Sequence, residues 1–261
     1  MIPICRTEKQ RTLFWKSFDR RRWQFLNKYE AMTRRALITQ VKPVLNSLKE
    51  GMSQGLAAVE LIDNDPILRV LEKLYLQVGT YYANDIFEGL KSVGGYQKKS
   101  EDDFITEVQA FIQTEGVVIA DLIANNTQNS VREIIRRAIE KGDTVEDVAR
   151  KLETSGRIAG RARARAIART EIISASNFGS LRGAERSGIP LKKEWISTRD
   201  NRTRGSDPKD VFDHIEPDGQ TRLLNEPFKV TGEDLMYPGD RRSASAGNTI
   251  MCRCTQAYIP I

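Results

Sequence analysis

The sequence predicts an α+β fold, in which a long, mainly helical N-terminal region is followed by a small, loop-rich α+β module. Apolar residues recur every three or four positions up to about residue 186, which is the spacing of one face of a helix. Gly188 and Pro190 then form the expected end of the last helix, and a stretch rich in glycine and proline follows. Short strands are expected there, at residues 192–198 and 250–259.

Four helical segments are expected in the N-terminal region. Their apolar spacing places them at residues 7–48, 65–90, 100–113 and 116–141. Pro43 is expected to bend or break the first segment, because proline lacks the backbone N–H that the helical ladder needs. Asp65 and Pro66 resemble a helix start, whereas Gly94 and Gly95 indicate a turn between the second and third segments.

The second half of the chain is expected to begin with a capped helix. Thr144, with Asp147 three residues further on, is typical of a capping box, and a last helix is expected at residues 157–186. The predicted division is therefore a helical assembly and docking region at residues 1–144 and a motif-bearing module at residues 145–261.

Composition excludes several classes of protein. The chain has 261 residues, of which 39% are hydrophobic, and this is enough for a buried core without disulfide bonds. We find no apolar run near the roughly 20 residues that cross a bilayer and no secretion signal, so we expect no membrane partner. Three cysteines fit a reducing compartment. Nucleotide hydrolysis and dinucleotide redox chemistry have no support, because neither glycine-rich phosphate-binding pattern is present.

Charge is distributed unevenly along the chain. The 41 Lys and Arg exceed the 35 Asp and Glu by a net charge of +6. Residues 1–40 and 129–171 are basic, whereas residues 41–128 between them are acidic. Such a pattern suits contact with a polyanion at some places and not at others.

The second basic segment contains arginines at a regular spacing. Arg157, Arg161, Arg165 and Arg169 would form one stripe along the expected helix, with Arg163 on another side. A stripe of this kind can neutralise DNA phosphates without sequence preference, so these five arginines are the candidate nucleic-acid-binding residues. The alternative is a solvated helix face, or a face that binds carboxylates of a neighbouring subunit.

In the first basic segment the cations alternate with aromatic side chains. This pattern fits a docking helix with aromatic anchors, a nucleic-acid or membrane-surface contact, or a core helix with exposed arginines. Trp15 and Trp23 do not share one narrow face, which favours helix packing or contact between subunits over lipid.

Cys252 and Cys254 lie two positions apart within an expected strand, where alternation points both sulfurs to the same face. Two thiols on one face suit a metal such as zinc, with His214, the single histidine, as a third ligand. The fourth ligand would be an aspartate, from Asp200, Asp213 or Asp240. The alternative is that both cysteines are buried as small apolar side chains and that the aspartates hold turns.

A series of short motifs follows one order over residues 145–258. An Arg-Thr-Glu helix is followed by a tryptophan strand, an aspartate after that strand, Asp-Gly, Pro-Gly-Asp and a terminal Cys-Arg-Cys-Thr. The motif residues are Arg169, Glu171, Trp195, Asp200, Asp218, Gly219, Pro238, Gly239 and Asp240, together with Asn177, Gly179, His214, Cys252 and Cys254. This order resembles the phage Mu F-like minor head protein, or head morphogenesis, family. The family usually has asparagine before the first cysteine, where this chain has Met251.

The resemblance implies a noncatalytic structural protein of tailed double-stranded DNA phages. Such a protein is made in the host bacterial cytoplasm and enters the virion in several copies, in the head interior or at the portal vertex. Its expected partners are the portal protein, the major capsid or scaffold protein and double-stranded DNA. Two alternatives stay open: a metal-dependent nuclease or toxin-like enzyme, and a basic nucleic-acid-binding protein. Any Ser-His or Cys-His nucleophilic mechanism would have to use His214, the single histidine.

Overall fold

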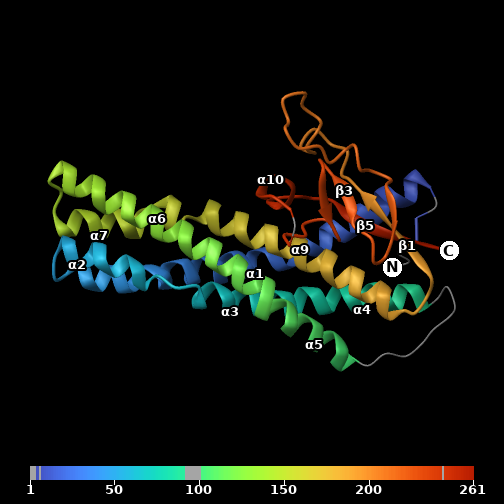
Figure 1. The fold of residues 1–261 in the computed structure, drawn as a ribbon, viewed down its shortest axis with the longest axis horizontal. Helices are drawn as coiled ribbons and strands as arrows, with labels where there is room; N and C mark the ends of the chain where they lie inside the picture. Colours follow the sequence, from blue (N-terminus) through green and yellow to red (C-terminus); the bar gives the residue numbers. More distant parts are fainter. Residues whose placement is uncertain (1–3, 6, 92–100, 243) are drawn as a thin grey trace. The chain divides into compact units, whose positions relative to one another are not determined.

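The computed structural model describes residues 4–5, 7–91, 101–242 and 244–261, and it confirms the predicted α+β class (Figure 1). The helical elements are α1 (Glu8–Leu48), α2 (Met52–Ala57), η1 (Ala58–Leu61), α3 (Asp65–Leu74), η2 (Tyr75–Gly79), α4 (Thr80–Lys91), α5 (Glu101–Phe111), η3 (Ile112–Gly116), α6 (Val117–Lys141), α7 (Val145–Thr154), α8 (Gly156–Ala159), α9 (Arg161–Arg186) and α10 (Ala246–Thr249). The strands are β1 (Leu191–Ile196), β2 (Thr221–Leu223), β3 (Phe228–Val230), β4 (Glu233–Leu235) and β5 (Thr255–Pro260). The turn expected at Gly94 and Gly95 lies outside the described residues. None of the described helices is both long and apolar enough to cross a bilayer.

The chain forms two compact units, each assembled from separate stretches of sequence. The first unit contains Met1–Leu26, Leu74–Gln109 and Arg169–Ile261, and the second contains Asn27–Lys73 and Ala110–Ala168. Helices α1 and α9 therefore contribute residues to both units. The predicted division into a docking region at residues 1–144 and a module at residues 145–261 assigns a function to each continuous part of the sequence. It does not describe compact units, and it stays a prediction.

The N-terminal helices occur where the apolar spacing predicts them, but two of their boundaries differ. Helix α1 continues through Pro43, so of the bend or break expected at this proline the break is wrong. Val41, Val44 and Leu48 are buried on either side of the proline, and their packing stabilises helical backbone that has lost one hydrogen bond. The expected gap between the third and fourth segments is also missing, since the π-helical η3 joins α5 directly to α6.

The capping box predicted at the start of α7 is confirmed. The backbone N–H of Asp147 donates to Thr144 Oγ1 at 3.2 Å, and the backbone N–H of Thr144 donates to the Asp147 carboxylate at 3.4 Å. The exchange satisfies two backbone donors that the first turn of a helix would otherwise leave unpaired.

The helix expected at residues 157–186 is interrupted near its start. Helix α8 ends before Gly160, whose backbone is extended, and α9 begins after it. A Cβ atom at Gly160 would lie 2.4 Å from the carbonyl oxygen of Gly156, so the close turn between α8 and α9 requires glycine. The other end of α9 is as predicted, because Gly188 has a φ of 67° and stops the helix.

The strands form two antiparallel sheets in the first unit. Strand β1 lies at the centre of the three-stranded sheet β2-β1-β5, and β3 pairs with β4. The prediction that the last strand begins at Ile250 is wrong, because β5 begins at Thr255. Helix α10 and the left-handed backbone of Met251, with a φ of 59°, occupy the preceding residues. The apolar core beside the sheets contains Trp195, Phe228, Val230, Leu235, Cys252 and Cys254.

Two glycines of α9 lie directly against backbone of another helical segment of the first unit. A Cβ atom at Gly179 would be 2.1 Å from the carbonyl oxygen of Gly79 in η2. One turn further on, a Cβ atom at Gly183 would be 2.3 Å from the carbonyl oxygen of Ala83 in α4. Larger residues at either position of α9 would force the segments apart.

Candidate functional site

The two cysteines and the histidine predicted as metal ligands lie together in the first unit. Nδ1 of His214 is 3.6 Å from Sγ of Cys252 and 3.7 Å from Sγ of Cys254. All three side chains are buried, with at most 2% of any of these residues exposed. Although Cys252 and Cys254 precede β5 rather than belonging to it, their sulfurs still face the same imidazole.

A chain of hydrogen bonds continues from the other side of the imidazole. His214 Nε2 lies 3.2 Å from Asn248 Oδ1, while Asn248 Nδ2 donates to Glu233 Oε2 at 2.7 Å and to the Val230 carbonyl at 3.1 Å. Burial opposes ionisation of Glu233, but the bonds from Asn248 and Ser245 hold its pKa below the usual value. The imidazole is thus held by a carboxylate acting through an amide.

The three ligand candidates perturb one another. The hydrogen bond from Cys254, and then the charge of His214, lower the pKa of Cys252 well below the usual value of a thiol. Burial, followed by the contact with Cys252, raises the pKa of Cys254. Burial alone would lower the pKa of His214, yet the adjacent Cys252 sulfur raises it. The protonation of each of these three groups therefore depends on that of the other two.

The aspartates considered as a fourth ligand lie elsewhere. Both carboxylate oxygens of Asp240 accept from the Arg242 guanidinium, at 3.0 and 2.9 Å, and one also accepts from the backbone N–H of Met236. Asp213 accepts from two backbone N–H groups of the turn that follows it, as its alternative role predicted. Asp200 binds Arg253. The group of candidate ligands among the described residues consists of His214, Cys252 and Cys254 alone.

The Arg-Thr-Glu motif lies on α9 at the start of its C-terminal part. Glu171 is completely buried and pairs with Arg241 at 2.9 Å, while the Tyr75 hydroxyl donates to it at 3.2 Å. Burial raises the pKa of Glu171 against the opposing charge of Arg241. Thr170 is the middle residue of the motif, and its hydroxyl accepts a hydrogen bond from the backbone N–H of Met251 at 3.1 Å. These contacts attach α9 to the segment that carries the cysteines.

Trp195 and the Asp-Gly motif form a second internal connection. The Trp195 ring meets the rings of His214 and Phe228 edge to face, at centroid distances of 5.9 and 5.3 Å. Its carbonyl accepts from the backbone N–H of Gly219 at 2.9 Å, where a φ of 82° requires glycine. Asp218 accepts from the backbone N–H of the residue that follows β1 and pairs with Arg11 and Arg199.

The residues of the remaining motifs also make contacts within the first unit. Arg253 pairs with Asp200 and, with backbone bonds, holds the pKa of that carboxyl well below its usual range. Pro238 and Gly239 turn the chain against α9, where Gly239 has a φ of 88°. The Asn177 amide donates to the Pro238 carbonyl at 2.8 Å.

Arg22 is a buried residue of the module that was not among the predicted site residues. This residue of α1 is 3% exposed, and its guanidinium donates to Ser176 Oγ, to Asn177 Oδ1 and to the carbonyl of Cys254. Nothing in its sequence context distinguishes it from its neighbours Arg20 and Arg21. The interpretation of the basic N-terminal segment as a core helix with exposed arginines is therefore wrong for this residue.

The predicted arginine stripe is distributed over two helices. Arg157 lies on α8 and pairs with Glu133, whereas Arg161 and Arg165 on α9 both pair with Glu30, at 2.6 and 2.7 Å. The hydrogen bond from Arg161, assisted by Arg165, lowers the pKa of Glu30. The side chain of Arg161 is 79% exposed and that of Arg165 is 39% exposed.

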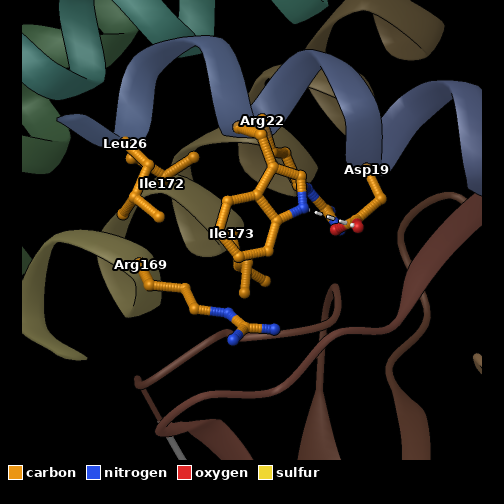
Figure 2. A pocket seen from close by; sticks show the side chains of 7 residues that line it. Asp19, Arg22, Leu26, Arg169, Ile172 and Ile173 are labelled. Atoms are coloured by element: carbon orange, nitrogen blue, oxygen red, sulfur yellow. Dashed lines mark hydrogen bonds between the residues drawn. The ribbon is translucent and has the colours of Figure 1, made fainter. Parts of the chain in front are cut away.

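The other two arginines of the predicted set have different contacts. Arg163 donates to the carbonyls of Arg157, Ile158 and Ile123 and to Thr127, so its guanidinium is directed inward. Arg169 belongs to the first unit, where its guanidinium lies 5.3 Å from the centre of the Trp23 ring. Figure 2 shows Arg169 at the side of a small pocket that Asp19 and Arg22 also line.

In the described part of the chain, the motif side chains of the first unit contact other side chains and backbone groups of the same unit. This arrangement defines a small structural module whose polar residues connect a helix, a sheet and their loops. Residues 129–257 match the family described as "Phage Mu protein F like protein", and this part of the chain belongs to that family. The resemblance inferred from the motifs is thereby confirmed.

Two curated proteins illustrate the similarity. The uncharacterized protein YqbB of Bacillus subtilis (strain 168) is 24% identical over 252 residues, which cover 88% of this chain and 77% of that protein. The NAD(+)--arginine ADP-ribosyltransferase EFV of Enterococcus faecalis (strain ATCC 700802 / V583) is 30% identical over 138 residues, which cover 52% of this chain and 26% of that protein. No solved structure gives a significant match.

The residue before the first cysteine has a left-handed backbone. Met251 has a φ of 59°, at the position where the resemblance leads us to expect asparagine. Asparagine adopts this backbone region more readily than methionine does. The position thus has a backbone role, since it turns the chain from α10 toward the two cysteines.

Proposed function

We propose that the chain is a noncatalytic minor capsid protein that acts as an adaptor during assembly of a phage head. The family match over residues 129–257 is the observation that carries this proposal, because the family indicates head morphogenesis or a minor capsid role. The motif residues make their contacts within the module, and these contacts make the module rigid. A rigid module agrees with an adaptor that binds its partners through other surfaces. A virion component is the corresponding location.

The portal protein is the proposed main partner. Among the exposed apolar side chains of the second unit, Val118 and Leu122 are each 55% exposed and lie one turn apart on α6. Neighbouring apolar residues on one helix face are typical anchors of a protein interface. We therefore assign the portal contact to this face of α6.

The chain is expected to co-sediment with assembled portal rings of the phage that encodes it. Because two buried aspartates would leave charges without partners in the interface, the V118D/L122D variant should bind at least 10-fold more weakly. The I38D/L61D variant is the matched control, because it makes the same change of charge at two exposed apolar residues outside α6, and it should bind as the parent chain does. A parent chain that remains unbound at the top of the gradient would contradict the portal assignment.

Double-stranded DNA is the proposed second partner, and Arg161 and Arg165 are the arginines best placed to contact it. Both side chains are exposed on α9 and pair with Glu30, and residues 157–169 contain five arginines and no acidic residue. Contacts with phosphate make affinity fall with salt, with a slope of about 0.9 per phosphate in a double-logarithmic plot.

The R161Q/R165Q variant is expected to reduce that slope by about 2 and to weaken DNA binding at low salt. Filter binding or fluorescence anisotropy between roughly 50 and 200 mM salt measures both quantities. The R69Q/R150Q variant makes the same change in net charge at two exposed arginines of other helices and should behave as the parent chain does. If both double variants bind DNA equally well, the assignment of the DNA contact to α9 is wrong. The proposed capsid role does not depend on that assignment.

Enzymatic activity receives less support from the site. His214, which a histidine-dependent nuclease would need, is 2% exposed and has both ring nitrogens engaged inside the module. The match to the ADP-ribosyltransferase covers 26% of that protein, so the match alone does not carry transferase activity over to this chain.

A further inference from the structure

We propose that His214, Cys252 and Cys254 bind one zinc ion, through Nδ1 of the histidine and Sγ of each cysteine. The ion would connect the loop that carries His214 to the segment before β5, and a water molecule would complete its tetrahedral coordination. Four observations on the described residues carry the proposal: the distances between ligand atoms, the orientation of Asn248, the number of donors and acceptors, and the rigidity of the cysteine backbone.

The two distances from the imidazole to the sulfurs agree with a tetrahedral metal site. With Zn–S bonds of about 2.3 Å and Zn–N bonds of about 2.0–2.1 Å, the ligand atoms of tetrahedral zinc lie about 3.5–3.8 Å from one another. His214 Nδ1 lies 3.6 and 3.7 Å from the two sulfurs, and all three atoms lie within 4.8 Å of one another. An ion can therefore enter without a large movement of the three side chains.

Asn248 leaves the metal-facing nitrogen of the imidazole free to bind. Its amide nitrogen donates to the Glu233 carboxylate and to the Val230 carbonyl, so its amide oxygen must be the atom that faces His214. That oxygen accepts a hydrogen bond, so Nε2 carries the proton and Nδ1 of the neutral ring presents its lone pair to the sulfurs. Metal-binding histidines are commonly held by such outer hydrogen bonds.

Hydrogen bonding alone does not satisfy the cluster. In the neutral state two thiols compete for the one lone pair of Nδ1, and the side chains around them are mainly apolar, including Trp195 and Phe228. When zinc binds, each thiol releases its proton to water and forms an S–Zn bond, while Nδ1 donates its lone pair to the ion. One cation thus replaces an arrangement in which two weak donors share one acceptor.

The backbone of the cysteine segment is held in place by contacts independent of the metal. The Cys254 carbonyl accepts from Arg22 at 3.4 Å and from Asn177 at 3.2 Å, and the Cys252 N–H donates to the Thr249 carbonyl at 3.3 Å. A site whose ligands are positioned before the ion arrives loses less conformational entropy on binding.

The full chain, purified under reducing conditions with added Zn²⁺ and then dialysed, is expected to retain one zinc per chain by elemental analysis. Replacement of zinc by Co²⁺ should give the absorption of thiolate-bound tetrahedral cobalt. Chelation should lower the melting temperature by roughly 5 °C or more, because the ion binds only the folded chain.

The variants Cys252→Ser and Cys254→Ser should each bind Zn²⁺ at least 100-fold more weakly and lose the cobalt spectrum. Asn248→Leu, which removes no ligand, should weaken binding by about 10–100-fold. Cys5→Ala is the matched control at the third buried cysteine and should bind as the parent chain does. Comparing circular dichroism spectra before metal is added distinguishes a lost site from a misfolded variant.

Two results would overturn the proposal. In the first, the reduced parent chain, which needs no variant to fold, binds neither Zn²⁺ nor Co²⁺. In the second, Cys252→Ser and Cys254→Ser retain one zinc per chain with unchanged affinity.

Discussion

The Asn177→Ala variant is expected to lose about 3 kcal/mol of its free energy of unfolding, because four buried hydrogen bonds disappear together. The amide of Asn177 donates to the carbonyls of Pro238 and Cys254, at 2.8 and 3.2 Å. Its oxygen accepts from Arg22 and Thr255, both at 2.9 Å. Each buried polar group left without a partner costs about 1–3 kcal/mol, and some of these groups keep a second bond.

Urea unfolding followed by circular dichroism measures this loss. Asn126→Ala is the control, since this exposed residue on α6 should change stability by no more than about 0.5 kcal/mol. Thr255→Val removes one of the four bonds and should lose about 1 kcal/mol, which keeps the test measurable if Asn177→Ala does not fold. Equal stability of Asn177→Ala and Asn126→Ala would show that this network does not stabilise the module.

The regular elements of the fold could be predicted where local chemistry determines them. Apolar spacing predicted the long helices. The residue types at the positions themselves predicted the capping box at Thr144 and the helix end at Gly188. One error occurs where tertiary packing decides, because burial on both sides of Pro43 maintains α1. The other two occur where the backbone turns sharply: the chain at Gly160 lies close against Gly156 and interrupts the last helix, and the left-handed Met251 delays the last strand.

The candidate site divides in the same way. His214, Cys252 and Cys254 could be selected from sequence because these residue types are rare in the chain and their chemistry is distinctive. Asn248, Glu233 and Arg22 could not, since such residues are common on surfaces and only the folded chain brings them to their partners. Asp240 was predicted as a ligand for its residue type, but Arg242 already pairs with its carboxylate.

Gly179→Ala is expected to lower the free energy of unfolding by about 3 kcal/mol, although alanine favours helices more than glycine does. The added Cβ atom would lie 2.1 Å from the carbonyl oxygen of Gly79, which is backbone and cannot rotate away as a side chain could. Helix α9 would have to move away from η2 and α4. That movement would also disturb the neighbouring contact between Gly183 and Ala83.

The control for this prediction is Gly156→Ala, a helical glycine whose Cβ atom would have no neighbour within 4 Å. Both substitutions gain helix propensity and both restrict the unfolded chain, by up to about 1 kcal/mol. The difference between their urea midpoints therefore isolates the cost of separating the two backbones. Equal midpoints would mean that α9 can shift at little cost, and the rigid attachment of the motif residues to this helix would then need another explanation.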